Sequence, residues 1–122
     1  MTQLVQYALA AAATGLAGLI IALLVYGYVN RQSAGSDAMQ SLARSIEEGA
    51  MAFLRREYMV LFPFLVIVAV LLGFAVGTHT ALAYIFGGVC SIGAGFAGMK
   101  AATKANVRTS EAARAEGQGK AL

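Results

Sequence analysis

Two long stretches without a charged side chain constrain the fold of this chain more than any other feature. No Asp, Glu, Lys or Arg occurs between Met1 and Asn30, and none occurs between Tyr58 and Met99. A helix needs about 20 apolar residues to cross the hydrocarbon layer of a membrane. The first stretch is long enough for one crossing and the second for two, so the sequence predicts an all-α, polytopic membrane protein.

The composition supports this fold class. Charged residues make up 12% of the 122 residues, whereas a soluble domain usually contains about 25%. Nucleic acid is not expected as a partner, because the basic C-terminal region contains no aromatic residue that could stack on bases. The single cysteine, Cys90, lies in apolar sequence, and we interpret it as a packing residue rather than a metal ligand.

The apolar stretches and the polar breaks between them predict three transmembrane helices. A cleaved signal peptide does not explain the first stretch, which has no basic residue before it and exceeds the roughly 7–15 apolar residues of such a peptide. The short GTHT sequence at 77–80 should form the turn of a hairpin. The expected boundaries are transmembrane helices at about 4–29, 58–76 and 80–99, a cytoplasmic helix at about 37–57, and a cytoplasmic tail at 100–122 with a short helix from Thr109 or Ser110.

The segment at 37–57 has an amphipathic pattern of its own. Asp37 followed by Gln40 resembles a capping box and predicts that a helix begins there. Apolar residues recur at spacings of three and four on one side, and charged residues occupy the other. The apolar side comprises Met39, Leu42, Ile46, Ala50 and Phe53, and the polar side comprises Arg44, Glu47, Glu48, Met51 and Arg55, with Arg44 and Glu48 as an i,i+4 pair. We expect this segment to continue directly into the second transmembrane helix.

Small residues recur every four positions in the third transmembrane helix. They form two ladders, one of Gly87, Ser91 and Gly95 and one of Ala94, Gly98 and Ala102. Ladders of this kind let a neighbouring helix approach closely in a membrane. We therefore expect close-packed helix neighbours along this span.

The positions of the basic residues predict the orientation of the chain. None of the nine lies in the N-terminal segment or in GTHT; they are Arg31, Arg44, Arg55, Arg56, Lys100, Lys104, Arg108, Arg114 and Lys120. Lys and Arg are enriched in cytoplasmic loops. We expect the N-terminus to lie outside and the C-terminal end in the cytoplasm, with the protein integral to a cell inner membrane.

The chain offers few residues for catalysis or ion translocation. No expected span contains the charged residue that an ion path normally needs, and GAGFAGMK at 93–100 lacks the Gly-Lys-Ser/Thr end of a Walker loop. A site for several Mg²⁺ ions needs clustered carboxylates, but the six acidic residues are scattered. His79 lies at the turn, where we interpret it as solvated rather than as a proton relay. We predict no catalytic, cofactor-binding or metal-ligating residue in this chain.

Two segments nevertheless resemble membrane-bound ion-translocating pyrophosphatases. EEGAMAFLRREY at 47–58 is similar to the membrane entry of the second helix in that family. GAGFAGMKAATKANVRTSEAAR at 93–114 is similar to the end of the third helix and the loop after it. The order, the spacing and the helix before these segments also agree, so the resemblance covers nearly the whole chain.

The resemblance implies a role within a larger pump. Members of the family are large homodimers that couple hydrolysis of Mg²⁺-pyrophosphate on the cytoplasmic side to pumping of H⁺ or Na⁺. Their aspartate-rich active site comes from later helices, so no catalytic residue carries over to this chain. The chain is expected to be the N-terminal part of such a pump, with GKAL at 119–122 as the start of a fourth helix. Its partners would then be the lipid bilayer and the remaining helices of the parent chain.

Two other interpretations stay open at the level of the sequence. The chain could be a small membrane protein that self-associates through its glycine ladders and has a structural role. It could also be part of a transporter of another family that shares the two segments without the pyrophosphatase function.

Overall fold

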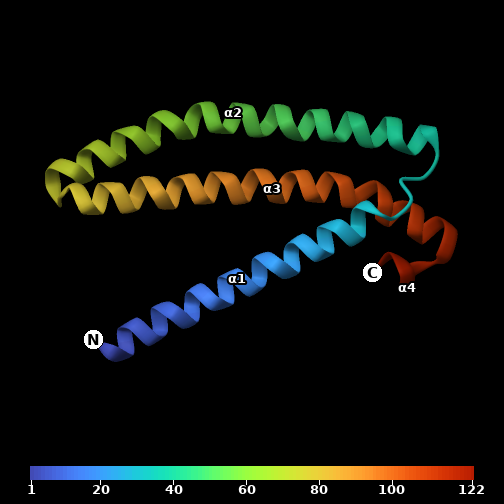
Figure 1. Cartoon of the computed structure of the whole chain (residues 1–122). Coiled ribbons are helices and arrows are strands. Elements are labelled where there is room, and N and C mark those ends of the chain that lie inside the picture. The colour runs from blue at the N-terminus through green and yellow to red at the C-terminus, as the bar shows by residue number, and fades with distance from the viewer. The chain divides into compact units, whose positions relative to one another are not determined.

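The computed structural model describes all residues from 1 to 122 and contains helices but no strand. Four helices follow one another along the chain (Figure 1): α1 (Thr2–Asn30), α2 (Asp37–Ala75), α3 (Thr78–Glu116) and the short α4 (Gln118–Ala121). The first three are long and apolar enough to cross a membrane. The predicted all-α fold with three such helices is confirmed.

The chain divides into two compact units, one of Met1–Ala34 with Arg108–Leu122 and the other of Gly35–Val107. The first unit contains α1, in which every residue from Thr2 to Val25 is exposed. A helix that is apolar all round needs lipid or other helices around it. The surface of α1 is therefore the surface expected of a transmembrane helix.

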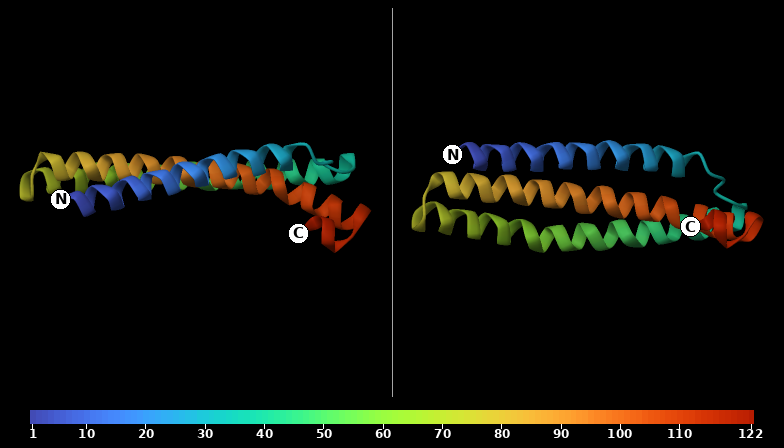
Figure 2. Two further views of the ribbon diagram at one scale, coloured as in Figure 1. Left: turned by 60° about the horizontal axis from the view of Figure 1, so that its bottom comes forward. Right: turned by 90° about the horizontal axis from the view of Figure 1, so that it is seen from below.

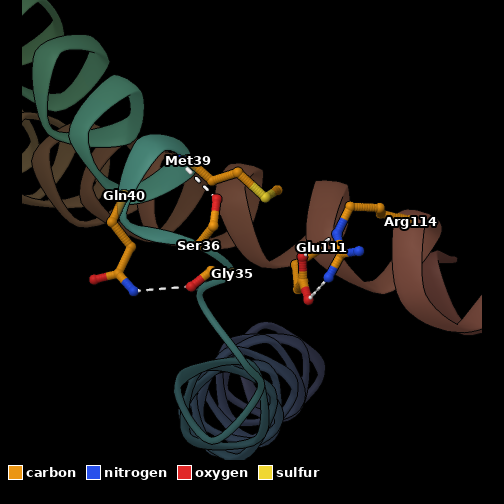
Figure 3. Close-up of polar contacts among 6 residues, drawn as sticks. All are labelled: Gly35, Ser36, Met39, Gln40, Glu111 and Arg114. Carbon is orange, nitrogen blue, oxygen red and sulfur yellow. Dashed lines mark hydrogen bonds and ion pairs between the residues drawn. The ribbon is translucent and has the colours of Figure 1, made fainter.

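The N-terminus of α2 is capped by Ser36 rather than by Asp37. The Ser36 Oγ accepts a hydrogen bond from the backbone N–H of Met39 at 3.4 Å, and the Gln40 side chain donates to the Gly35 carbonyl at 3.0 Å (Figure 3). Asp37 lies in the first turn, where its negative charge interacts favourably with the helix dipole. The predicted helix start is confirmed, but the predicted capping box is wrong: Ser36 is the cap, and the residue three positions later is Met39, which cannot complete a capping box.

The second helix runs from its charged half into its apolar half without interruption, as predicted. Its 39 residues correspond to a length of about 58 Å, nearly twice the roughly 30 Å hydrocarbon thickness of a bilayer. Pro63 lies inside the helix and does not end it. One end of α2 must therefore project beyond the hydrocarbon layer.

Val76 and Gly77 alone connect α2 to α3. Their backbone N–H groups both donate to the Leu72 carbonyl, at 2.9 and 3.0 Å, and Gly77 adopts φ of +140°, which favours glycine. The Gly77 carbonyl already accepts the N–H of Ala81 at 3.2 Å, so the last three residues of GTHT belong to α3 and the predicted turn at 77–80 was too long. The predicted hairpin is confirmed, since α2 and α3 lie antiparallel and side by side within Gly35–Val107 (Figures 1 and 2).

The third helix does not end where its apolar sequence ends. It continues through Lys100 to Glu116, so the prediction of a separate short helix capped by Thr109 or Ser110 is wrong. No Gly or Pro occurs in this stretch, and its many alanines favour helix. The helix ends at Gly117, which adopts φ of +86°, and the short α4 follows.

Candidate functional site in the helix hairpin

Each helix of the hairpin buries one face. The residues that are buried or half-buried recur mostly at spacings of three and four, the spacing of helices that pack along their length. On α2 they include Glu47, Met51, Leu54, Tyr58, Leu61, Leu65, Val68 and Leu72, and on α3 they include Ala81, Tyr84, Gly88, Ile92, Met99, Thr103 and Val107. This seam is the packed core of the hairpin.

Among the glycines of the hairpin, Gly88 has the tightest contact with the facing helix. A Cβ atom at this position would lie 2.6 Å from the Cδ2 atom of Leu65, closer than real Cβ contacts. Nearer the turn, a Cβ at Gly73 would lie 3.7 Å from the Cβ of Ala81, which is an ordinary contact. Glycine at position 88 therefore makes room for a leucine of the facing helix.

A hydrogen bond joins the two helices at the charged end of the apolar sequence. The Tyr58 hydroxyl donates to the backbone carbonyl of Ile92 at 2.9 Å. A Cβ at Gly95 would lie 3.5 Å from the same hydroxyl oxygen, which is an ordinary contact. Tyrosine is enriched at membrane interfaces because its ring is apolar and its hydroxyl is polar.

Only part of the predicted small-residue ladders lies in the seam. A Cβ at Gly95 would contact Tyr58, but a Cβ at Gly87 or Gly98 would meet nothing within 4 Å. Ser91 and Ala94 are exposed. The glycine that lies against a side chain of α2 is Gly88, which the predicted ladders did not include.

The charged half of α2 is rotated relative to the prediction. Glu47 and Met51, assigned to the polar side, are half-buried in the seam, whereas Leu42, Ile46 and Phe53 are exposed. The reason is that α2 is one continuous helix. The seam-facing residues Leu65 and Tyr58 lie on the same side of this helix as Met51 and Glu47, which precede them at spacings of seven and four. The predicted i,i+4 pair of Arg44 and Glu48 forms no ion pair.

Ion pairs occur instead beyond the apolar part of α3. The Arg114 guanidinium donates two hydrogen bonds to the Glu111 carboxylate at 2.8 and 2.9 Å (Figure 3), and Lys120 lies 3.9 Å from Glu116. The hydrogen bond from Arg114, and secondly its charge, lower the pKa of Glu111 below its ordinary value. At the end of the apolar sequence the Lys100 Nζ lies 5.7 Å from the centre of the Phe96 ring.

The structure contains no group of side chains that could hold a metal ion. Nowhere in the chain do three His, Cys, Asp or Glu side chains come together, and Cys90 is an exposed free thiol. The expectation that the chain carries no catalytic, cofactor-binding or metal-ligating residue stays a prediction. What the chain provides is a packed pair of helices.

Comparison with known proteins relates this chain to membrane pumps. The family described as inorganic H+ pyrophosphatase matches residues 16–122. A Clostridium tetani protein, provisionally named a K(+)-stimulated pyrophosphate-energized sodium pump, is 51% identical over 108 residues, which cover 88% of this chain and 16% of that protein. A K(+)-insensitive pyrophosphate-energized proton pump of Pyrobaculum aerophilum is 38% identical over 125 residues, covering 98% of this chain and 17% of that protein.

A K(+)-stimulated pyrophosphate-energized sodium pump of Thermotoga maritima is also 38% identical, over 89 residues that cover 73% of this chain and 12% of that protein. The chain therefore spans between 12% and 17% of the length of these relatives. The relatives and the three long apolar helices together identify an integral membrane protein. The chain belongs to the inorganic H+ pyrophosphatase family.

Proposed function

We propose that these 122 residues supply packing helices of a membrane pump that couples pyrophosphate hydrolysis to translocation of H⁺ or Na⁺. The observation that carries this proposal is the family match over residues 16–122. Both ions belong to the proposal because relatives named as proton pumps and as sodium pumps match the chain. The seam of the hairpin, with its contacts at Gly88 and Tyr58, suits a supporting role rather than a catalytic one.

The substrate and its metal ion would bind elsewhere in the intact protein. Pyrophosphate carries several negative charges, and its hydrolysis needs cations that neutralise the charge developing on the phosphoryl group. Mg²⁺ suits this role and is held by carboxylates together with substrate phosphates. Because the acidic residues of this chain do not cluster, the remaining helices of the parent chain would hold Mg²⁺ and pyrophosphate. The further partners in this proposal are lipid and a second subunit in a homodimer.

The proposed orientation places the N-terminus and the α2–α3 turn outside, and the ends of α2 and α3 that carry basic residues in the cytoplasm. It rests on the absence of Lys and Arg from residues 1–30 and from the turn. Single cysteines are introduced at Thr2, Thr78 or Ser36 in a Cys90→Ala background. In intact cells, an impermeant maleimide should label the variants Thr2→Cys and Thr78→Cys and should label Ser36→Cys only after the membrane is opened. Labelling of Ser36→Cys from outside would reverse the orientation.

A chimeric pump tests the proposed role. Residues of this chain replace the aligned segment of the Pyrobaculum aerophilum proton pump, to which the match covers 98% of the chain. We expect the chimera to fold in the membrane and to keep pyrophosphate hydrolysis and proton uptake within about tenfold of the original pump, a loss equivalent to about 1.4 kcal/mol. The control carries Leu65→Arg, which places a charge in the apolar half of α2 and should abolish assembly.

The outcomes of the chimera experiment separate the proposal from its alternative. A chimera that inserts and purifies as a discrete species but hydrolyses no pyrophosphate would contradict the proposed role. If the isolated chain also formed a defined oligomer, the inactive chimera and the oligomer would together favour the alternative, a self-associating membrane protein with a structural role.

A further inference from the structure

An apolar face on the charged half of α2 has no partner in this chain. Leu42, Ile46 and Phe53 expose 68%, 50% and 61% of their surfaces and lie on one side of the helix, since their spacings are four and seven. Gly49 lies between them, and a Cβ there would meet nothing within 4 Å. Grouped exposed apolar side chains bordered by polar residues mark interaction sites. We call Leu42, Ile46, Gly49 and Phe53 the outer face of α2.

Lipid is not the occupant that suits this face. α2 is a single helix, so Leu42 lies about 20 Å along its axis from Arg55. Arg55 and Arg56 belong outside the hydrocarbon because burying a charged side chain there is costly. In the proposed orientation the Leu42 end of the outer face therefore projects into the aqueous layer, where burial of apolar side chains against protein is favourable, and the Phe53 end lies close to the membrane surface.

A shallow, open hollow lies at the end of the outer face nearest the membrane. This hollow of about 490 Å³ is lined by Ala52, Phe53, Arg56, Glu57 and Val60. Phe53, Arg56, Glu57 and Val60 have the spacing i, i+3, i+4 and i+7. Four residues in this arrangement form the hole that accepts one knob of a facing helix.

The area of the face favours a helix of the same polypeptide over a second copy. Its three large side chains leave roughly 300–400 Å² of apolar surface uncovered, whereas stable complexes of separate chains bury about 800 Å² on each partner. A covalently connected helix gains from a high effective concentration. The matched relatives have ample length for such a helix, because this chain corresponds to only 16% and 17% of the first two.

We propose that another helix of the same polypeptide packs along the outer face of α2, crosses close to Gly49 and places an apolar knob in the hollow beside Phe53. This inference rests on the proposed function, since it takes the chain to be part of a longer pump. The contact would join the projecting end of the hairpin to the body of the pump. Arg44 and Glu48, on the opposite side of α2, would stay in water.

Cysteine labelling of the intact pump tests the contact. Ile46→Cys and the matched control Glu48→Cys lie two residues apart and on opposite sides of the same helix, each in a background without other cysteines. In the native protein, a water-soluble maleimide should react at least about tenfold more slowly with Ile46→Cys than with Glu48→Cys, because reaction needs a local opening of the packed contact. The two rates should become equal after denaturation. Equal rates in the native protein would overturn the proposal.

A photocrosslinking amino acid in place of Phe53 identifies the occupant. The expected product joins two peptides of one polypeptide and migrates as a single subunit. A product that joins two subunits, or a lipid adduct, would overturn the choice of occupant. Pyrophosphate hydrolysis is measured on the same preparations. Because labelling and crosslinking report the contact whether or not hydrolysis occurs, failure of this inference and failure of the proposed function are distinguishable.

Discussion

Replacement of Gly88 by leucine is expected to destabilise the α2–α3 hairpin by about 1–3 kcal/mol, the usual range for overpacking, whereas replacement of Gly87 by leucine is expected to have little effect. Even the first carbon of a side chain at position 88 would lie 2.6 Å from Leu65, but at position 87 it would meet nothing within 4 Å. The rest of the leucine at 88 has to enter the same space, so Leu65 must move and the packing between the helices must rearrange.

The two variants form a matched pair. They are adjacent in one helix and make the same change, so the gain in helix propensity on replacing glycine is the same for both. Gly88→Ala is a third variant for comparison. It adds a single methyl group, from which the end of the Leu65 side chain can rotate away. Its effect should fall between those of the two leucine variants.

Energy transfer between the two helices measures this difference. In a Cys90→Ala background, dyes are attached through cysteines at Glu48 and Ala102, one on the charged half of each helix. The chain is held in mild detergent, and SDS is added until energy transfer is lost. The Gly88→Leu chain should lose it at a clearly lower SDS fraction than the Gly87→Leu chain. Identical transitions would mean that the close approach at Gly88 does not hold the hairpin together.

The number and type of the helices could be predicted because they depend on features that the sequence displays directly. The uncharged runs before Asn30 and after Tyr58 fix where helices can cross a membrane. The continuity of α2 also followed, since no Gly or Pro interrupts residues 50–62. These predictions do not depend on which faces of the helices are in contact.

The faces of the helices could not be predicted from local patterns alone. The segment at 37–57 contains an apolar stripe on one side, but the side that meets α3 is set farther along, where Tyr58 bonds to Ile92 and Leu65 fits over Gly88. In the same way, Gly87 and Gly88 differ by about 100° around the helix axis. The four-residue spacing predicted that Gly87 faces a neighbouring helix, but Gly88 is the glycine that lies against Leu65. Thr109 and Ser110 were read as caps, although they also fit inside a helix whose next glycine is Gly117.

The chain contains no group of side chains that could hold a metal ion, and the proposed pump function rests on the family match. This combination leads to the second large expected effect. The isolated 122-residue chain should neither hydrolyse pyrophosphate nor bind it, because it has no cluster of carboxylates to hold the Mg²⁺ ions that the reaction needs. The intact protein that contains these helices should do both.

Hydrolysis of pyrophosphate in the presence of Mg²⁺ by the isolated chain and by the intact protein, measured side by side in one detergent, tests the central claim most directly. The control omits Mg²⁺ from each sample. We expect phosphate release from the intact protein alone, and transport of H⁺ or Na⁺ when the same protein is placed in sealed vesicles. Mg²⁺-dependent hydrolysis by the isolated chain would contradict the absence of an active site from these helices. An intact protein that is inert toward pyrophosphate would contradict the proposed pump.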